Sequence, residues 1–387
     1  MRFDFIIVGG GAAGLSLLYR LLTEPELSQK QVLVLDKVPK NRNDRTWCFW
    51  TDTELPFEPI IYRSWQQIRV VSENMEQTFP LDRLRYKMIR GIDFYEEVQQ
   101  KARHFPNVTF RQAEVAAVSS DTEKATVTLR SGETYTADWV FDSRFQLSTL
   151  QKDASAITLL QHFKGWVIQT PEPAFDPERI TMFDFRTPQP DGLYFFYTLP
   201  FSPHRALVEY TAFSPQLLPT PEAYTEPLAA YIRERLSISA FHVEEEEYGV
   251  IPMSNYRFVR YPSPRVLRIG VAGGRAKPST GYAFLRTQRD ADHIVRSLRD
   301  TGAPPKSWDE KPRFWVYDTL LLDILQRDGS NVKPLFEQLF RNNPIERLLL
   351  FLDERTSFAD DIQVMASVRP WPFLYALRNL AIRQRLK

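Results

Sequence analysis

FDFIIVGGGAAG, residues 3–14, is the stretch of sequence that decides the fold. It opens with an apolar run typical of a buried parallel strand, and its glycines at positions 9, 11 and 14 fit the pattern G-x-G-x-x-G. Leucines at helical spacing follow over residues 15–22, and a second apolar strand over residues 31–35 ends in Asp36. This order predicts a strand, a glycine turn, a helix and a second strand that together bind a dinucleotide, against the alternative of a purely structural turn.

Each residue of this motif has a physical role in such a site. Gly9 allows the tight turn, Gly11 lets the backbone approach a pyrophosphate, and Gly14 lets the helix pack close to the strand. The helix N-terminus directs free N–H groups and the positive end of its dipole at the phosphates. Asp36 is placed to accept hydrogen bonds from ribose hydroxyls, and an acid there argues against a 2′-phosphate.

Composition excludes several classes of protein. The net charge is only +1, so no large electrostatic field attracts nucleic acid. Cys48 is the only cysteine and the five histidines are scattered, which excludes disulfides within the chain and makes a metal site improbable. No signal peptide and no run of 18 apolar residues is present, so we expect a cytoplasmic protein without a membrane span.

A change of periodicity along the chain predicts a mixed α/β protein of three parts. Alternating strands dominate residues 151–260, which favours an antiparallel substrate-binding sheet, and residues 265–299 return a second glycine-rich strand, loop and helix. The expected parts are a discontinuous dinucleotide-binding domain (1–55, 81–150 and 261–300), a substrate-binding domain (56–80 and 151–260) and a helical C-terminal region (301–387).

Local patterns give more detailed expectations. Residues 125–129 and 133–137 predict a hairpin, residues 60–80 two strands, and residues 138–144 a separate strand whose acid is Asp142. Residues 81–84 are expected to open a helix. Residues 44–50, DRTWCFW, are expected to form a loop near the cofactor cleft, where the aromatic cluster is either the wall of a pocket or ordinary core.

One strand holds the most informative carboxylate. Alternation over residues 206–213 puts Glu209 on the same face as Leu207 and Phe213. If that face is covered, desolvation raises the pKa of Glu209 and makes it a general acid near neutral pH; if it is the solvent face, Glu209 is an ordinary solvated residue.

Other acids have simpler explanations. Asp184 is expected to share a face with Met182 and Arg186, either as a functional carboxylate or as a partner in a salt bridge. Four consecutive glutamates, residues 244–247, are typical of a solvated strand end, and only Glu247 deserves closer study because it precedes the apolar run YGVIPM.

Taken together, these segments resemble the FAD-containing lycopene cyclases, a family of carotenoid cyclases. The matching segments span nearly the whole chain: the N-terminal glycine motif, residues 45–47 with Trp50, residues 182–185, 197–200, 207–211, 249–253, 272–273, 278–282 and 351–354. The resemblance implies a p-hydroxybenzoate-hydroxylase-like flavoprotein fold. It also implies cyclisation of the linear ψ-ends of lycopene to β-rings without net redox change, with FAD in its reduced form and NADPH as the electron donor.

The resemblance also assigns roles to residues. Glu209 matches the first glutamate of the plant F-L-E-E-T motif and implies acid–base catalysis, but the second glutamate is Tyr210 here; Asp184 matches a second family carboxylate, although Phe183 separates it from Met182. The implied cofactor-binding residues are Gly9, Gly11, Ala13, Gly14, Asp36, Arg45, Asp142, Gly273, Thr280, Gly281 and Tyr282. The implied substrate-binding residues are Trp47, Trp50 and Tyr197, whose rings would stabilise a carbocation.

A water-insoluble polyene substrate requires contact with a membrane surface. Residues 371–387 mix Trp, Phe and Leu with Arg and Lys, which suits an amphipathic helix lying on the inner membrane as well as a helix docked on the protein. Two rival functions stay open: an FAD-dependent monooxygenase or prenyl-chain reductase of the same fold, and a non-catalytic isoprenoid-binding escort. The monooxygenases and reductases of this fold usually have a Gly-Asp pair in the second glycine-rich unit. Residues 269–274 lack this pair, which favours the cyclase.

Overall fold

A mostly parallel sheet forms around the N-terminal strand. The computed structural model describes residues 1–153, 155–308 and 311–385. Its first sheet has the order β8-β2-β1-β11-β10-β9, with β17 also paired to β11. β1 (Arg2–Val8) lies between β2 (Val32–Asp36) and β11 (Thr134–Asp142), parallel to both, and its burial on both faces explains its apolar sequence. The remaining strands are β8 (Val108–Gln112), β9 (Val115–Ser120), β10 (Ala125–Leu129) and β17 (Val266–Arg268).

Helices cover one face of this sheet and a β-meander covers the other. α1 (Ala12–Thr23), α2 (Gly91–Ala102) and α4 (Phe284–Thr301) bury their apolar sides in one cluster with β1 and β2. On the opposite face, β9 and β10 continue antiparallel from β11 and close a second, smaller cluster. The predicted hairpin of β10 and β11 is therefore confirmed.

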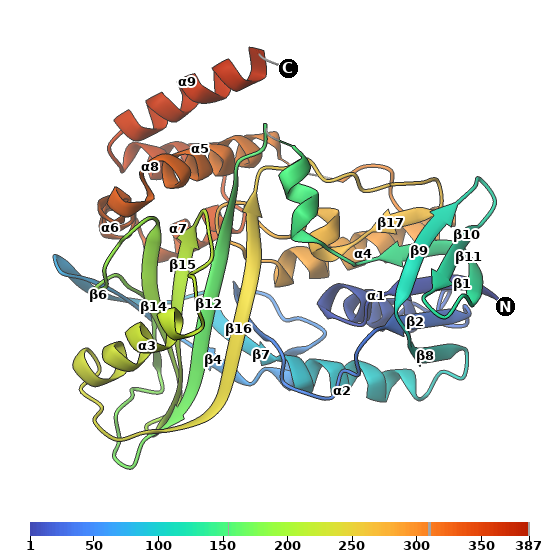
Figure 1. The fold of residues 1–387 in the computed structure, drawn as a ribbon, viewed down its shortest axis with the longest axis horizontal. Helices are drawn as coiled ribbons and strands as arrows, with labels where there is room; N and C mark the ends of the chain where they lie inside the picture. The colour runs from blue at the N-terminus through green and yellow to red at the C-terminus, as the bar shows by residue number, and fades with distance from the viewer. Residues whose placement is uncertain (154, 309–310, 386–387) are drawn as a thin grey trace.

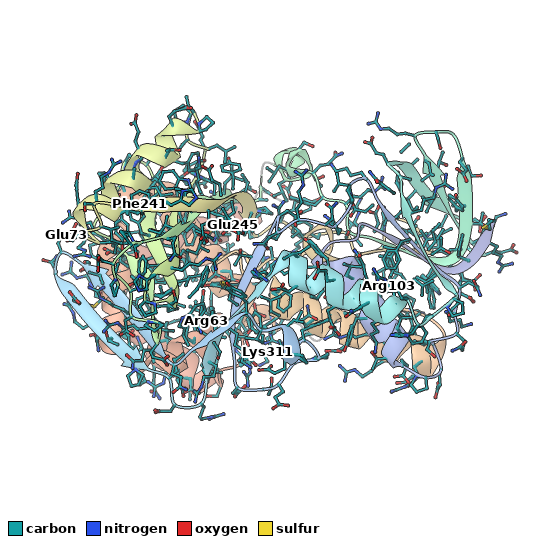
Figure 2. The ribbon with its side chains drawn as sticks, turned by 90° about the horizontal axis from the view of Figure 1, so that it is seen from below. Arg63, Glu73, Arg103, Phe241, Glu245 and Lys311 are labelled. Carbon is teal, nitrogen blue, oxygen red and sulfur yellow. The ribbon has the colours of Figure 1, made fainter. Side chains whose placement is uncertain are left out.

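A second sheet of long strands stands beside the first (Figure 1). Its order is β16-β12-β15-β14-β13-β5-β6, in which the β14–β15 hairpin is central. Figure 2 shows that the two sheets belong to opposite halves of the molecule. Glu73, at the β5–β6 turn, lies at the outer edge of the half that contains the second sheet, and Arg103, just after α2, lies in the half that contains the first sheet. The strands are β5 (Gln67–Ser72), β6 (Met75–Pro80), β12 (Thr158–Gln169), β13 (Arg179–Asp184), β14 (Leu193–Ser202), β15 (Arg205–Ser214) and β16 (His242–Ser254).

Both faces of the second sheet are buried by different elements. α3 (Glu222–Glu234) covers one face. The other face packs against the C-terminal helices and a small sheet in the order β3-β7-β4. These elements are β3 (Thr46–Thr51), β4 (Arg63–Trp65), β7 (Arg85–Arg90), α5 (Pro312–Asp328), α6 (Lys333–Asn342), α7 (Ile345–Leu352), α8 (Phe358–Ala366) and α9 (Trp371–Arg385). Short 3₁₀ turns are η1 (Glu58–Ile60), η2 (Leu147–Lys152), η3 (Gly270–Gly273) and η4 (Gly329–Asn331).

Several local predictions are wrong. Residues 44–50 do not form a loop, because residues 46–51 pair with β7 as strand β3. No helix begins at residues 81–84; the chain there leads into β7, and the helix starts at Gly91. Residues 134–142 form one strand rather than two, and residues 60–80 contain three strands rather than two. The proposed domain boundaries stay predictions.

Two kinds of feature are absent from the described residues, a membrane-spanning helix and a metal-binding cluster. None of the helices they form is long and apolar enough to cross a membrane. No group of three or more His, Cys, Asp or Glu side chains among them is arranged to hold a metal ion.

Replacing Phe195 by Ala should destabilise the second sheet. Phe195 is fully buried, and its ring centroid lies 4.7 Å from that of Phe183 and 5.2 Å from that of Phe213. A cavity left by Phe→Ala costs about 3–5 kcal/mol. We expect a clear loss of thermal stability, whereas Val259→Ala at a half-exposed position should stay within about 0.5 kcal/mol of the wild type. Equal melting temperatures for the two variants would contradict this packing.

Candidate active site

The glycine turn after β1 has the shape of a dinucleotide cradle. Gly9 has φ +101°, in the region that favours glycine, and a Cβ on Gly14 would lie 2.0 Å from the carbonyl oxygen of Gly9. By contrast, a Cβ on Gly11 would meet nothing within 4 Å, so Gly11 faces open space at the N-terminus of α1. The geometry thus leaves the helix N-terminus accessible to a phosphate group.

Asp36 stabilises this turn. Its Oδ2 accepts a hydrogen bond from the Gly10 N–H at 2.7 Å, and its Oδ1 accepts one from the Val38 N–H at 2.9 Å. A carboxylate has about four lone-pair sites, so acceptor capacity toward a ribose hydroxyl is left.

A second glycine-rich segment crosses the start of α1. Gly270, with φ +60°, approaches Ala13 so closely that a Cβ on it would lie 2.7 Å from the Ala13 methyl group. Gly273 is buried, and its carbonyl oxygen accepts a hydrogen bond from Arg260. Gly281, with φ +71°, brings this segment against Gln161 of β12. The buried atoms Gln161 Oε1 and Thr280 Oγ1 have no hydrogen-bond partner among the described residues, so polar groups of a ligand could be accommodated there.

Two other predicted cofactor residues have protein partners. Asp142, at the end of β11 beside Val8, makes a two-point ion pair with Arg144 at 2.9 and 2.8 Å. Arg45 is exposed and donates to the carbonyl oxygen of Asp44 at 2.6 Å.

An apolar cavity lies between the second sheet and the C-terminal helices. Its lining of aromatic and aliphatic side chains suits an apolar ligand. One wall is formed by Met182, Phe183, Tyr197 and Phe213 of the sheet, with Trp50 of β3 and with Thr280 and Tyr282 of the glycine-rich segment. The opposite wall is formed by side chains of α5 to α9, among them Phe314, Tyr317, Phe336, Phe340, Phe351, Met365 and Phe373.

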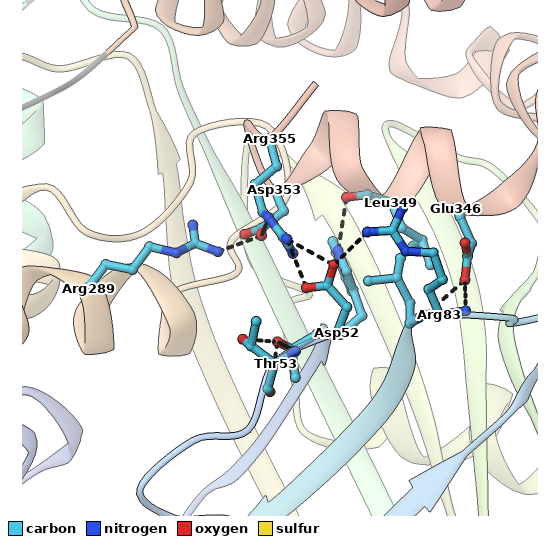
Figure 3. A network of polar contacts seen from close by, with 11 residues as sticks. Asp52, Thr53, Arg83, Arg289, Glu346, Leu349, Asp353 and Arg355 are labelled. Atoms are coloured by element: carbon cyan, nitrogen blue, oxygen red, sulfur yellow. Dashed lines mark hydrogen bonds and ion pairs between the residues drawn. The ribbon is translucent and has the colours of Figure 1, made fainter. Parts of the chain in front are cut away.

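Polar contacts hold the helical wall against β3 (Figure 3). Trp50 donates from Nε1 to the carbonyl oxygen of Leu349 at 2.9 Å. Asp52, at the end of β3, forms ion pairs with Arg355 at 2.8 Å and with Arg83 at 3.2 Å. Asp353 pairs in turn with Arg289 of α4. The chain after α7 is therefore fastened to both β3 and α4.

Trp47 does not line the cavity, contrary to the prediction. β3 is a strand, so residues 47 and 50 point to opposite faces. Trp47 packs among Phe94, Tyr95 and Phe284 of the first half, whereas Trp50 faces the cavity.

Glu209 is buried on the covered face of β15. Its neighbours on that face, Leu207 and Phe213, belong to the core beneath the C-terminal helices, and the Thr211 hydroxyl donates to Glu209 Oε1 at 2.6 Å. Burial, followed by the nearby charge of Glu247, raises the pKa of Glu209 well above its usual value. Burial and the neighbouring carboxylate therefore favour the protonated form of Glu209.

Two tyrosines of the cavity wall lie close to Glu209. Tyr197, directly opposite Glu209 on β14, and Tyr282 line the cavity and interact electrostatically with Glu209, which is not one of the lining residues. The Tyr282 hydroxyl lies 3.2 Å from that of Tyr86, and burial raises the pKa values of all three tyrosines. The carboxyl group thus lies beside neutral hydroxyls and aromatic rings of the cavity wall.

Asp184 lies away from this site, which is a correction of its predicted catalytic role. A register shift in β13 places Asp184 opposite Phe196, on the face covered by α3. There it pairs with Arg186 at 2.6 Å and accepts a hydrogen bond from Tyr231 at 3.0 Å. The alternative of a structural salt bridge is the one that this geometry favours.

Sequence reasoning singled out Glu247 without giving it a role, and it missed Thr46 and Cys48. Glu247 of β16 and Cys48 of β3 lie near Glu209, and Thr46 of β3 donates a hydrogen bond to Glu247. Gly165 in the middle of β12 was the available signal, because glycine inside a strand often marks a close approach of other groups. The aromatic residues of α5 to α7 had no signal, since aromatic stripes on helices are typical of ordinary core.

A model of the family described as lycopene cyclase protein matches residues 4–378. Lycopene beta-cyclase of Pantoea ananas is 24% identical over 99% of both chains, and that of Pseudescherichia vulneris is 25% identical over 97% of this chain and 96% of its own. The chloroplastic lycopene beta cyclase of Arabidopsis thaliana is 27% identical over 78% of this chain, and the match spans 61% of the plant protein's length.

Solved structures of flavin enzymes share the fold. A geranylgeranyl bacteriochlorophyll reductase-like protein from Thermoplasma acidophilum aligns with a TM-score of 0.61 and 13% identity over 99% of both chains. The p-nitrophenol 4-monooxygenase of Pseudomonas putida aligns with a TM-score of 0.59 and 14% identity, covering 95% of this chain and 97% of its own. The predicted fold is confirmed by these likenesses.

Two glycine variants should separate folding from cofactor binding. Gly14→Ala places a methyl group against the Gly9 carbonyl oxygen, so we expect a loss of roughly 1–3 kcal/mol or more in stability. Gly11→Ala meets no protein atom, so the fold should keep its melting temperature while binding of the dinucleotide weakens about tenfold or more, or ~1.4 kcal/mol. Thermal melting measures the change in stability, and the absorbance of bound flavin measures the change in cofactor binding. If Gly11→Ala retains as much bound flavin as the wild type, the glycine turn is not the dinucleotide-binding site.

Proposed function

Because the chain belongs to the lycopene cyclase family, we propose that it cyclises the linear ψ-ends of lycopene to β-rings. The observation that supports this most directly is Glu209, a buried acid beside Tyr197 and Tyr282, two residues that line the aromatic cavity. A protonated carboxyl group in such a place suits acid catalysis on an apolar alkene.

FAD fits the residues present as the cofactor. Gly9, Gly11 and the α1 N-terminus would hold its pyrophosphate, Asp36 a ribose, and the segment with Thr280 and Gly281 its ring system. When bound in its reduced anionic form, FAD would place a negative charge near the cationic intermediate, and NADPH would supply the electrons for that reduction.

The proposed reaction begins with proton transfer from the Glu209 carboxyl group to the terminal alkene of the ψ-end. A tertiary cation results, and the neighbouring double bond attacks it and closes a six-membered ring. Loss of a ring proton to a carboxylate then gives the β-ring. One proton enters and one leaves, so the reaction is an isomerisation without net redox change.

The cavity walls suit a carbocation. The rings of Trp50, Tyr197 and Tyr282 offer π faces, which attract cations, near the buried acid. The lining is almost entirely apolar, so little water is available to quench the cation.

Access to a membrane-dissolved substrate is proposed to occur at α8 and α9. Phe358, Trp371, Leu374, Leu377 and Ile382 are exposed on these helices, while Val364, Val368 and Phe373 of the same region line the cavity. α9 also docks on the protein, since Ala376 is fully buried and Asn379 donates to Asp323 of α5. The helix thus has one face for docking and another that suits a lipid interface; residues 386 and 387 of the predicted segment lie outside the described residues.

Replacing Glu209 by Gln should abolish cyclisation while FAD stays bound. Gln cannot donate the proton as an acid, and loss of a general acid lowers the rate by at least ~10². The assay follows the conversion of lycopene in red cells, or in vesicles with reduced flavin. Glu226→Gln, exposed on α3, serves as the control and should be active. Wild-type turnover in Glu209→Gln would exclude the proposed role, and NADPH consumed in proportion to product would favour a reductase or monooxygenase.

Charged residues on α9 should release the protein from vesicles. Each buried large apolar side chain contributes about 1.5–3 kcal/mol, so Trp371→Glu, Leu374→Glu and Leu377→Glu combined should lower the partition coefficient by more than ~10². The control has Glu at three exposed apolar positions elsewhere, namely Val38, Phe110 and Val259. Flotation with anionic vesicles measures the bound fraction, and an unchanged fraction in the α9 variant would reject this surface.

A further inference from the structure

Glu209 and Glu247 meet across a strand that has no side chain between them. Gly165 of β12 is paired with Glu209 of β15 on one side and with Glu247 of β16 on the other. A Cβ on Gly165 would lie 3.5 Å from Glu209 Cβ and 3.2 Å from Glu247 Cγ. Any other residue at position 165 would therefore stand between the two carboxyl groups.

Each carboxyl group has its own hydroxyl donor on the outer side. Thr211 donates to Glu209 Oε1 at 2.6 Å, and Thr46 of β3 donates to Glu247 Oε2 at 2.7 Å. These bonds engage one oxygen of each residue, and a side-chain hydrogen bond also joins the two glutamates. A carboxylate can only accept, so a hydrogen bond between two carboxyl groups requires that one of them carries a proton.

Glu247 differs from the three glutamates that precede it. Glu244 and Glu245 pair with Arg205, and Glu246 pairs with Lys164 at 3.2 Å. Among the described residues, no ion pair within 4.0 Å is found for Glu247. If Glu247 only stabilised the strand, we would expect it to form an ion pair with a basic side chain, as the three preceding glutamates do. Its position beside another carboxyl group, that of Glu209, therefore needs another explanation.

We propose that Glu209 and Glu247 act as one carboxyl pair that holds a single proton, with Glu247 positioning that proton on Glu209 and accepting the ring proton at the end of the reaction. This inference rests on the proposed cyclisation and adds a second carboxylate to it. The plant motif has a second glutamate where this chain has Tyr210. Glu247 of β16 would supply that second carboxyl group from another strand.

The proton balance of this pair closes without another reactant. Before reaction the pair holds one proton and one negative charge. Transfer to the alkene leaves two carboxylates close together in an apolar region, which is a strongly basic arrangement and attracts the cation beside it. Removal of the ring proton by Glu247 restores one proton to the pair, and its passage to Glu209 prepares the next cycle.

The surrounding groups keep the pair in this state. Burial is the main cause that raises the pKa of both residues; the charge of Glu247 raises that of Glu209 further, while the Thr46 hydroxyl and Glu209 lower that of Glu247. The proton is therefore held on Glu209. The other titratable or charged groups that interact with the pair are Arg45, which precedes β3, Cys48 of β3, Tyr197 of β14, Glu245 of β16 and Tyr282.

Glu247→Gln tests the pair in the full-length, FAD-loaded protein. Because the neutral amide removes the like charge, the pKa of Glu209 should fall, and the alkaline limb of the kcat/KM profile should move down by about one pH unit or more. With the accepting carboxylate gone, kcat should fall at least ~10-fold, while KM and flavin content change little. The matched control is Glu246→Gln, the adjacent glutamate paired with Lys164, which should keep the wild-type profile.

Gly165→Ala gives an independent test, because it keeps both carboxyl groups and forces them apart. Its pH profile should move in the same direction as that of Glu247→Gln, and Glu247→Asp should restore part of the alkaline limb. The inference is overturned if Glu247→Gln retains the wild-type profile and kcat, or if Glu246→Gln shows the same shift. A wild-type protein that leaves lycopene unchanged would instead refute the proposed function, so the two failures are distinguishable.

Discussion

A carboxyl group buried in an apolar sheet face is the constraint on which the rest of this structure depends. An ionised carboxylate in such a place is strongly unfavourable, which favours the protonated form of Glu209, and its Oε1 accepts one hydrogen bond from Thr211. The same apolar surroundings leave little room for water beside the carboxyl group. The raised pKa and the water-poor surroundings of Glu209 are therefore consequences of one arrangement rather than separate features.

The site forms where the two halves of the molecule and the C-terminal helices meet. β3 contributes Thr46 to the carboxyl pair and Trp50 to the cavity, although it belongs to neither large sheet. The glycine-rich segment reaches the helices through Lys277, which is buried and pairs with Asp318 at 2.8 Å and with Glu354 at 3.0 Å. Burial alone would raise the pKa of Glu354, but Lys277 and Arg286 outweigh it and lower that pKa to about 2. Movement of the helical wall would thus separate charges that stabilise one another.

Predictions from the sequence succeeded where local physics decides the outcome. The glycine turn and the flanking strands follow from periodicity and from the backbone needs of glycine. Alternation also placed Glu209 on the same face of β15 as Leu207 and Phe213, but only the structure shows that this face is covered. Sequence-based predictions failed where contact with a segment distant in the sequence determines the local structure. Pairing with β7 makes residues 46–51 a strand and turns Trp47 away from the cavity, and the register shift in β13 moves Asp184 to the α3 face. No local pattern contains either fact.

By itself, the sequence determined a glycine turn of the dinucleotide-binding type, a region of alternating strands and an acid at position 209 on the same strand face as Leu207 and Phe213, because these depend on residues that are neighbours along the chain. Only the tertiary structure decided that Glu247 faces that acid, that Asp184 does not, and that five C-terminal helices enclose the cavity. The physical reason is that strand register and helix packing are set by contacts between distant segments. A glycine at position 165 then determines whether two buried carboxyl groups can meet.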